Sequence, residues 1–261
     1  MAMSVVVNLL SGVHATIRLE EGSPLEELRR RARSELGVSI GKLVTSSGSV
    51  LPRAGNLAEA GVGDGDCLTA VIQEVVVAAS HCAFASIRED GSVVAWGDAE
   101  SGGDCSAVQH QLYNVHLIQA SCAAFAALRT DGCVVTWGSD GCGGDSSGVQ
   151  GQLRDVCEIQ ATAEAFAAIR ADGSVVTWGD SGGDCSQVRD QLYNVGCIQA
   201  NSFAFAALRG DGTVVTWGDA LAGGDSTAVQ SQLKDVLRIF NCGGAFAAIK
   251  PGGEVVCWGR R

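Results

Sequence analysis

One pattern of apolar positions is repeated five times between residues 74 and 261. Each copy has an apolar run, an Ala-Phe-Ala strand, a tight turn and a Val-Val-x-Trp-Gly strand, as in AFAAIRADGSVVTWGD at 165–180. The tryptophans that end the copies are 41, 41, 39 and 41 residues apart, and they are Trp96, Trp137, Trp178, Trp217 and Trp258. A fixed period of this length indicates one supersecondary unit copied several times. Three short strands rich in alanine and glycine cannot bury a face alone, so we predict that neighbouring copies stack.

A basic residue ends the second strand of every copy, just before the turn. An Asp-Gly pair supplies the positive-φ positions of a tight hairpin in four copies, and Gly252-Gly253 supplies them in the fifth. The basic residues are Arg88, Arg129, Arg170, Arg209 and Lys250. One interpretation is a basic ring on one face of the repeats. The other is a local ion pair between each residue and the acids of its own hairpin.

The linkers between copies carry a Gly-Gly-Asp triplet, at 102–104, 143–145, 182–184 and 223–225. In three linkers Ser-x-x-Gln or Thr-x-x-Gln follows the triplet, which is the pattern of a capping box. A glycine pair favours a turn. We therefore predict a short helix in each linker, with the aspartate near its N-terminus.

The first 73 residues have a different pattern. Two β-rich runs at 4–10 and 14–19 are joined by Ser11-Gly12, which predicts a hairpin. A capping box at 23–26 and apolar residues at helical spacing predict a helix up to Leu36, ended by Gly37. Strands at 42–45 and 67–72 complete a ββαββ order. The helix carries four arginines that we expect on its solvated face, Arg29, Arg30, Arg31 and Arg33.

The segments VVVNLLSG, LEELRRRARSELGV, KLVTSSGSVL and AGVGDGDCLTAVIQ resemble the ubiquitin-like family over nearly all of residues 1–73. The resemblance implies a β-grasp (α+β) domain. It also implies an interaction patch at Leu10, Thr45 and Val71, with threonine at the central position of a patch that is hydrophobic in the family. No Gly-Gly follows Gln73, so we do not expect a conjugated modifier.

The phrase DGxVxxWG after an Ala-rich strand resembles the regulator of chromosome condensation repeat. The three-stranded copies are similar to the repeats of the type II β-lactamase-inhibitory protein. The resemblance implies that residues 74–261 form a mainly-β propeller of five three-stranded repeats with short linking helices, as a closed ring or an open arc. That family usually has seven blades, and a histidine where these copies have Ala83, Ala124, Ala165, Ala204 and Ala245. We expect the tryptophans to form the repeat core, each buried between its own repeat and the next.

Charge is unevenly divided along the chain. Of the net −11, residues 74–261 carry about −10, with 11 basic and 21 acidic side chains. Such a surface repels phosphate backbones and favours a basic protein partner, so we expect no nucleic-acid binding. No apolar run approaches the ~18 residues of a membrane span, and the N-terminus lacks the features of a signal peptide. We therefore expect a monomer in the cytoplasm or nucleus that does not bind a membrane.

Candidate chemistry is sparse. The chain has eleven cysteines and no CxxC pair, and Cys105, Cys133 and Cys185 align with serine or threonine in other copies, which predicts free thiols and no metal. GDSGG at 179–183 and AASHC at 78–82 match serine-protease motifs, but the repeat places them in different copies, away from any triad. Paired linker acids such as Asp98 and Asp104 are expected to form turns and caps rather than a cation site.

The sequence therefore predicts a non-enzymatic interaction scaffold or adaptor, without a cofactor. The ubiquitin-like resemblance links it to the ubiquitin pathway, and the propeller would bind a protein client. The alternatives are a guanine-nucleotide exchange or chromatin-associated factor, by analogy with the propeller's namesake, and a fragment of a larger HECT-type ubiquitin ligase. A hydrolase is the third alternative, which a serine-reactive probe would distinguish.

Overall fold

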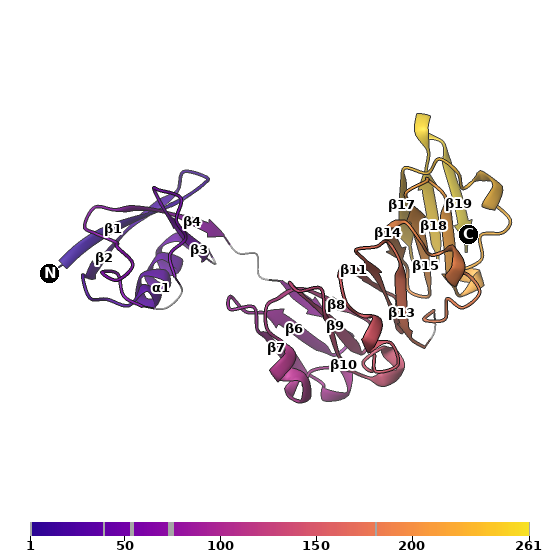
Figure 1. Cartoon of the computed structure of the whole chain (residues 1–261), viewed down its shortest axis with the longest axis horizontal. Coiled ribbons are helices and arrows are strands. Elements are labelled where there is room, and N and C mark those ends of the chain that lie inside the picture. Colours follow the sequence, from indigo (N-terminus) through magenta and orange to yellow (C-terminus); the bar gives the residue numbers. More distant parts are fainter. Residues whose placement is uncertain (1, 39, 53–54, 73–75, 181, 261) are drawn as a thin grey trace. The chain divides into compact units, whose positions relative to one another are not determined.

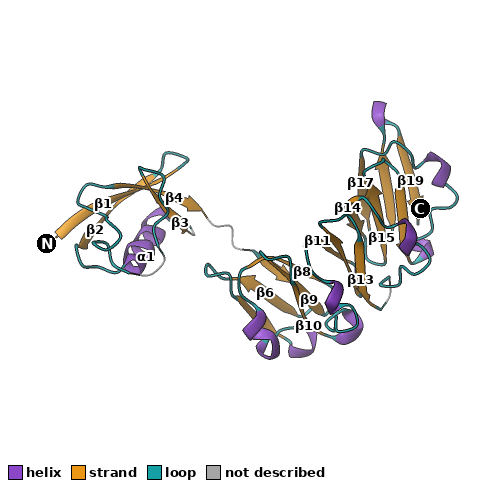
Figure 2. Ribbon diagram, viewed as in Figure 1, coloured by secondary structure: helices purple, strands orange, loops and turns teal. Residues whose placement is uncertain are grey.

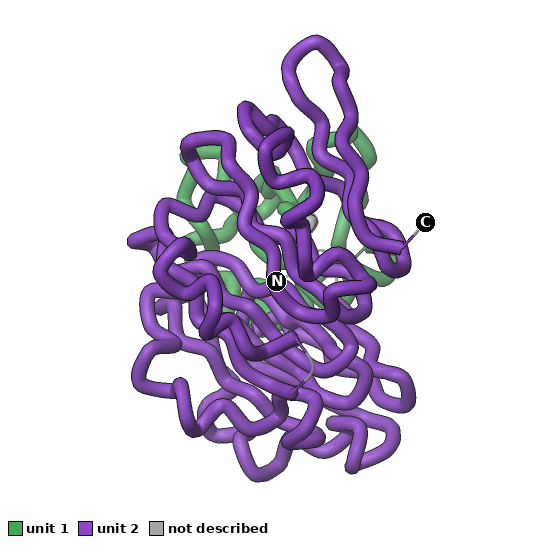
Figure 3. Tube along the Cα trace, turned by 90° about the vertical axis from the view of Figure 1, so that its right-hand side faces the viewer, with its two compact units in different colours: residues 1–75 green, residues 76–261 purple. Residues whose placement is uncertain are grey.

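The computed structural model describes residues 2–38, 40–52, 55–72, 76–180 and 182–260. The chain divides into two compact units, Met1–Val75 and Val76–Arg261 (Figure 3). The boundary expected after residue 73 lies outside the described residues.

The N-terminal unit is a four-stranded sheet with one helix, in the expected ββαββ order of a β-grasp fold. Its sheet order is β2-β1-β4-β3, with β1 and β4 parallel and the two outer pairs antiparallel. The elements are β1 (Ala2–Leu9), β2 (His14–Glu20), α1 (Leu25–Leu36), β3 (Ile40–Thr45) and β4 (Cys67–Ile72). The helical spacing of Leu25, Leu28 and Ala32 buries these side chains completely against the sheet.

The start of helix α1 differs from the prediction. Its N-cap is Pro24, in an extended conformation with no side-chain cap, so the predicted capping box is wrong. The Ser23 hydroxyl lies one residue too early and accepts a hydrogen bond from the Glu20 N–H, closing the turn after β2. The end of the helix is as predicted, because Gly37 has the left-handed conformation that stops it.

The arginines of α1 do not share one environment. Arg29 is buried, and its Nη2 donates to the carbonyl oxygens of Leu51 and Pro52. Arg30 and Arg31 instead lie on the surface with Glu27. The prediction of a solvated face is therefore wrong for Arg29, whose planar guanidinium satisfies carbonyls that a loop brings under the helix.

The second unit contains five three-stranded antiparallel sheets, one for each repeat (Figure 2). The sheets are β5 (Val77–Ala79), β6 (Ala83–Ile87) and β7 (Val93–Gly97); β8 (Val115–Ala120), β9 (Ala124–Arg129) and β10 (Val134–Gly138); β11 (Val156–Ala161), β12 (Ala165–Arg170) and β13 (Val175–Gly179); β14 (Val195–Ala200), β15 (Ala204–Arg209) and β16 (Val214–Gly218); and β17 (Arg238–Cys242), β18 (Ala245–Ile249) and β19 (Val255–Gly259). In every sheet the Ala-Phe-Ala strand is the middle one, paired with both others.

The sheets follow one another like blades, with the first strand of each repeat beside the first strand of the next. Figure 1 shows the first repeat, with β6 and β7, at one end of this unit and the last repeat, with β18 and β19, at the other. The five repeats therefore form an open arc.

Phenylalanine and tryptophan face each other across the middle and last strands of every repeat. Phe125 pairs with Trp137, and their rings are stacked with centroids 5.3 Å apart. Trp137 packs against Ala83 and Ala85 of the preceding repeat. We expected each tryptophan to lie against the following repeat. This prediction is wrong, because the tryptophan lies against the preceding repeat.

Burial of the tryptophans separates the first repeat from the others. Trp137, Trp178, Trp217 and Trp258 are only 4–6% exposed, whereas Trp96 is 45% exposed. The first repeat has no preceding alanine-rich sheet within the described unit to cover its aromatic rings.

The linkers contain short helices, as predicted, and these are 3-10 helices. They are Ala99–Ser101, Ser106–Gln111, Asp140–Cys142, Gln150–Gln152, Arg189–Gln191, Ala220–Ala222 and Gln230–Gln232. The expected capping boxes are wrong, because no side chain caps the helices that follow them. The glutamine of each expected capping box reaches away from the turn. Gln109, Gln150 and Gln230 donate from Nε2 to the carbonyl oxygens that begin the third strands, at 3.0–3.1 Å.

Candidate protein-interaction site

The loops that join the first and second strands of the repeats surround one hollow. Its volume is about 430 Å³, and every one of the five repeats contributes to its lining. The lining residues are Ala79, Ser80, His81, Ser121, Cys122, Ala161, Thr162, Ala163, Ala200, Asn201, Ser202, Asn241 and Gly243. The stacking of repeats therefore brings together loops that are about 40 residues apart in the chain.

In the first four repeats, the loop is held by a polar side chain at its first position, where the fifth repeat has Cys242. The Ser121 hydroxyl donates to the Cys142 carbonyl oxygen at 2.8 Å and accepts from the Ala124 N–H at 3.0 Å. Ser80 and Asn201 make the same two kinds of contact in their repeats. Such side-chain turns fix the backbone of a short loop.

Backbone hydrogen bonds also join neighbouring loops. The N–H of His81 donates to the Cys122 carbonyl, that of Cys122 to Ala163, and that of Ala163 to Ser202, at 2.8–2.9 Å. Because loops and neighbours are both fixed, the rim of the hollow is a rigid frame.

The residues that this frame presents differ in every repeat. The second and third loop positions are His81-Cys82, Cys122-Ala123, Ala163-Glu164, Ser202-Phe203 and Gly243-Gly244. His81, Cys82 and Phe203 are exposed. A similar anchor beneath variable exposed tips is typical of loops that carry recognition. Sequence reasoning missed this site, although the aligned series Ser, Ser, Thr and Asn at the anchor position of the first four repeats was a usable signal.

Two thiols meet beside the rim. The Sγ atoms of Cys122 and Cys142 are 3.3 Å apart. Burial and the neighbouring Cys142 thiol raise the pKa of Cys122 to about 11. A thiol with so high a pKa is protonated at neutral pH and is a poor nucleophile. All eleven cysteines are free thiols, as the sequence predicted.

The candidate basic ring is made of locally paired side chains. Arg129, Arg170, Arg209 and Lys250 each form an ion pair with an acid of their own hairpin, at 2.6–3.3 Å. Arg129 and Arg209 also stack over the rings of Tyr113 and Tyr193, and their side chains are only 14% exposed. The structure therefore supports the local-pair interpretation in these four repeats.

The linker aspartates, unlike the locally paired basic side chains, bond to the backbone. Asp104, Asp145, Asp184 and Asp225 are exposed, and each accepts a hydrogen bond from the N–H two residues later, at 2.8–2.9 Å. This backbone hydrogen bond holds the pKa of each carboxyl below its usual range. Within the described ranges no group of three or more His, Cys, Asp or Glu is arranged to hold a metal ion.

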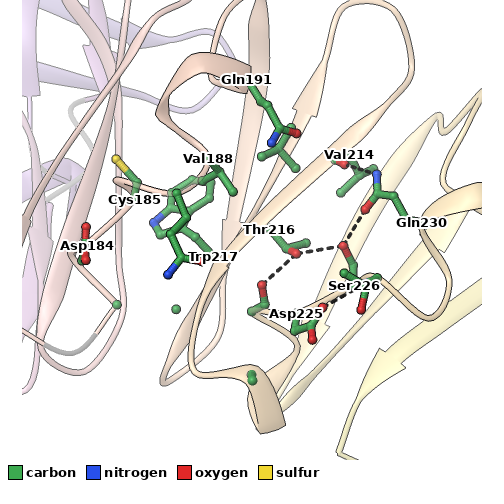
Figure 4. A pocket seen from close by; sticks show the side chains of 17 residues that line it. Asp184, Cys185, Val188, Gln191, Val214, Thr216, Trp217, Asp225, Ser226 and Gln230 are labelled. Atoms are coloured by element: carbon green, nitrogen blue, oxygen red, sulfur yellow. Dashed lines mark hydrogen bonds between the residues drawn. The ribbon is translucent and has the colours of Figure 1, made fainter.

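The linker between the third and fourth repeats is two residues shorter than the others, and a groove of about 760 Å³ lies beside it (Figure 4). Trp137, Trp178 and Trp258 donate from Nε1 to a glycine carbonyl of the preceding linker at 2.9–3.0 Å. The buried Nε1 of Trp217 finds no acceptor among the described residues. The nearby hydroxyls of Thr216 and Ser226 already bond one another at 2.9 Å. Among the described residues that line this groove, the indole N–H of Trp217 is the one buried side-chain donor without a partner.

The ubiquitin-like patch is interrupted at its centre. Leu10 and Val71 are exposed. The hydroxyl of Thr45 accepts from the Ser49 N–H at 3.1 Å and bonds the Ser47 hydroxyl at 2.8 Å. Thr45 therefore serves the turn after β3 and presents no apolar surface between the other two.

The protease-like motifs gain no support from the described residues. Ser181 lies outside them. The hydroxyl of Ser80 donates to the Ser101 carbonyl oxygen at 2.9 Å, and neighbouring His81 is exposed. No helix in the described part of the chain is long and apolar enough to cross a membrane.

Comparisons with solved structures found weak similarities to each of the two units. Human WBSCR16 is 19% identical, over 71% of this chain and 62% of its own, with a TM-score of 0.47. Yeast RCC1 (Prp20), in a structure bound to Kap60, is 15% identical over 71% of this chain and 56% of its own, with a TM-score of 0.49. A designed protein based on human erythrocytic ubiquitin is 25% identical over 28% of this chain and 92% of its own, with a TM-score of 0.25.

The chain thus spans less than two thirds of the length of the human and yeast proteins that it matches. No protein-family model and no curated protein matches it. The described residues form a β-grasp unit and a unit of five three-stranded antiparallel sheets.

Proposed function

We propose that this chain is a non-enzymatic protein-interaction adaptor. The repeat unit binds a protein client at the loops that join the first and second strands of each repeat, which are called the inner loops. The N-terminal unit connects that client to the ubiquitin pathway. The observation that carries the proposal is the rigid frame of loops around one hollow, in which the anchors are alike and the exposed tips differ.

Charge supports a basic segment as the part of the client that binds. Residues 74–261 carry about −10. Four of the five basic residues at the ends of the second strands form local ion pairs. The linker aspartates are ionised, since backbone hydrogen bonds lower their pKa. Lysine and arginine side chains of a client are the natural complement of such a surface.

The pathway assignment rests on the likeness of the N-terminal unit to ubiquitin. Its exposed Leu10 and Val71 offer apolar contacts, while Thr45 makes the patch weaker than a continuous hydrophobic one. We expect weak binding of a ubiquitin-interacting helix, lost in a Leu10→Asp Val71→Asp variant. Binding that this variant leaves unchanged would remove the pathway half of the proposal.

Selection from a displayed random peptide library on the full chain tests the client site. We expect enrichment of Lys- and Arg-rich peptides, with affinity that falls as salt rises. Phe203→Ala, at a loop tip, should weaken the selected peptides. Leu221→Ala, at an exposed apolar side chain on a linker, is the matched control and should not.

Two results would overturn the client site. One is a set of selected peptides whose affinity changes neither with Phe203→Ala nor with salt, and the other is no enrichment of any peptide. Labelling of the folded chain by a serine-reactive fluorophosphonate would instead contradict the non-enzymatic assignment.

A further inference from the structure

The two faces of each repeat sheet are different, and they meet in a fixed order inside the chain. One side carries the stacked Phe and Trp rings and is called the aromatic face. The other carries alternate alanines of the middle strand and is called the alanine face. Between the second and third repeats, Ala124 and Ala126 of one face pack with Phe166 and Trp178 of the other. The same pairing joins all four pairs of neighbouring repeats.

The aromatic face of the first repeat is left open. Phe84 is 45% exposed, like its partner Trp96, whereas the equivalent phenylalanines of the other repeats are at most 2% exposed. The rings of Phe84 and Trp96 remain stacked at 5.6 Å, so the face has the same shape as the four buried ones.

The alanine face of the last repeat is open as well. Val255 is 54% exposed, and its equivalents Val134 and Val214 are at most 1% exposed. Ala245 and Ala247 are half-buried, where the matching alanines of the interior repeats are fully buried. The first repeat therefore exposes an aromatic face and the last repeat exposes an alanine face. These two kinds of face form the interface between every pair of neighbouring repeats in the unit.

The charges of the two ends are complementary. Residues 76–104, in the first repeat and the linker that follows it, hold one basic and five acidic side chains. Residues 236–260, in the last repeat, hold three basic and one acidic side chain, although the chain as a whole is strongly acidic. An acidic head and a basic tail attract each other in a second copy.

We propose that this chain self-associates head to tail, with the aromatic face of one copy's first repeat seated on the alanine face of another copy's last repeat. The contact continues the interface found between neighbouring repeats, and it replaces the monomer expected from sequence. It is heterologous, so it produces dimers and longer open assemblies. It is weaker than the internal contacts because association costs translational and rotational freedom.

Sedimentation of the full chain over a range of concentrations tests this contact. We expect reversible growth from monomer to dimer and larger species, weakened by salt. Trp96→Ala, which damages only the aromatic face, and Val255→Asp, which damages only the alanine face, should each weaken association by ~10-fold or more, about 1.4 kcal/mol. Leu221→Asp adds the same charge at an exposed apolar side chain of a linker and should have no effect. Unchanged far-UV spectra and unfolding midpoints confirm that the variants fold.

Mixing the two damaged proteins gives the sharpest result. Trp96→Ala keeps its alanine face and Val255→Asp keeps its aromatic face. At a concentration where the unchanged chain associates, each variant alone should stay mostly monomeric while the mixture forms a dimer that grows no further. A chain that stays monomeric at every concentration overturns the proposal. So does a dimer that survives Val255→Asp alone, which would mean pairing of two aromatic faces, or one that Leu221→Asp weakens equally.

Discussion

Removal of single tryptophan side chains measures what stacking of the repeats contributes to stability. Trp178 is 5% exposed, stacks on Phe166 at 5.3 Å and donates to the Gly143 carbonyl at 3.0 Å. Trp178→Ala therefore loses a buried ring, its stacking partner and a hydrogen bond, and should lower the free energy of unfolding by about 3–5 kcal/mol. Trp96 has the same stacking but is 45% exposed. Trp96→Ala should cost about 1–2 kcal/mol, in proportion to the smaller buried area.

Urea unfolding followed by tryptophan fluorescence suits this comparison. All five tryptophans lie in the repeat unit, so the signal does not report on the N-terminal unit. Each variant keeps four of them. The protein should be dilute, because head-to-tail association would add stability at Trp96. Equal costs at the two sites would refute the open arc, and a cost near zero at Trp178 would refute the burial of its ring.

Three further predictions concern single groups. Trp217→Phe should cost about 1 kcal/mol less than Trp178→Phe in the same urea assay, because Trp217 has no described hydrogen-bond acceptor to lose; equal costs would contradict this. Hydrogen bonds from two arginines of helix α1 lower the pKa of Glu27 to about 2. Its stabilisation of the helix should be present above its unfolded pKa of about 4.3 and lost as pH falls toward 2. Hydrogen exchange of α1 should show this loss, and Glu27→Gln should abolish the pH dependence. Mild oxidation with diamide should join Cys122 to Cys142 first, so that the count of free thiols falls from eleven to nine; labelling and mass spectrometry would show any other pair.

Much of the fold could be predicted because each signal was local. The tryptophan period defined the repeats, Asp-Gly pairs defined their hairpins, and Gly37 ended the only α-helix described. The environment of Arg29 could not be predicted in this way, since the carbonyls that it binds lie 22 and 23 residues further along a loop. Helical periodicity reports which side of a helix is apolar, and an arginine under a loop breaks that pattern.

The inner loops were missed for a related reason. Their anchors are serine, threonine and asparagine, which are common in any loop, and their tips share no residue type. A repeat suggests function through what its copies have in common, whereas this site depends on where they differ. The 39-residue spacing did single out the third linker, but the orphaned indole of Trp217 follows only from the contact of each tryptophan with the preceding linker.

The direction of stacking decides what the ends of the unit can do. Alternation along a strand shows that both faces of each sheet are apolar, and it leaves open which face meets the preceding repeat. The linker settles the direction, because in three of the four linkers a glycine carbonyl accepts the indole N–H of the following tryptophan, as Gly102 does for Trp137. The aromatic face must then remain open at the first repeat and the alanine face at the last. The two open surfaces are therefore complementary rather than identical, which favours a head-to-tail contact over a symmetric dimer.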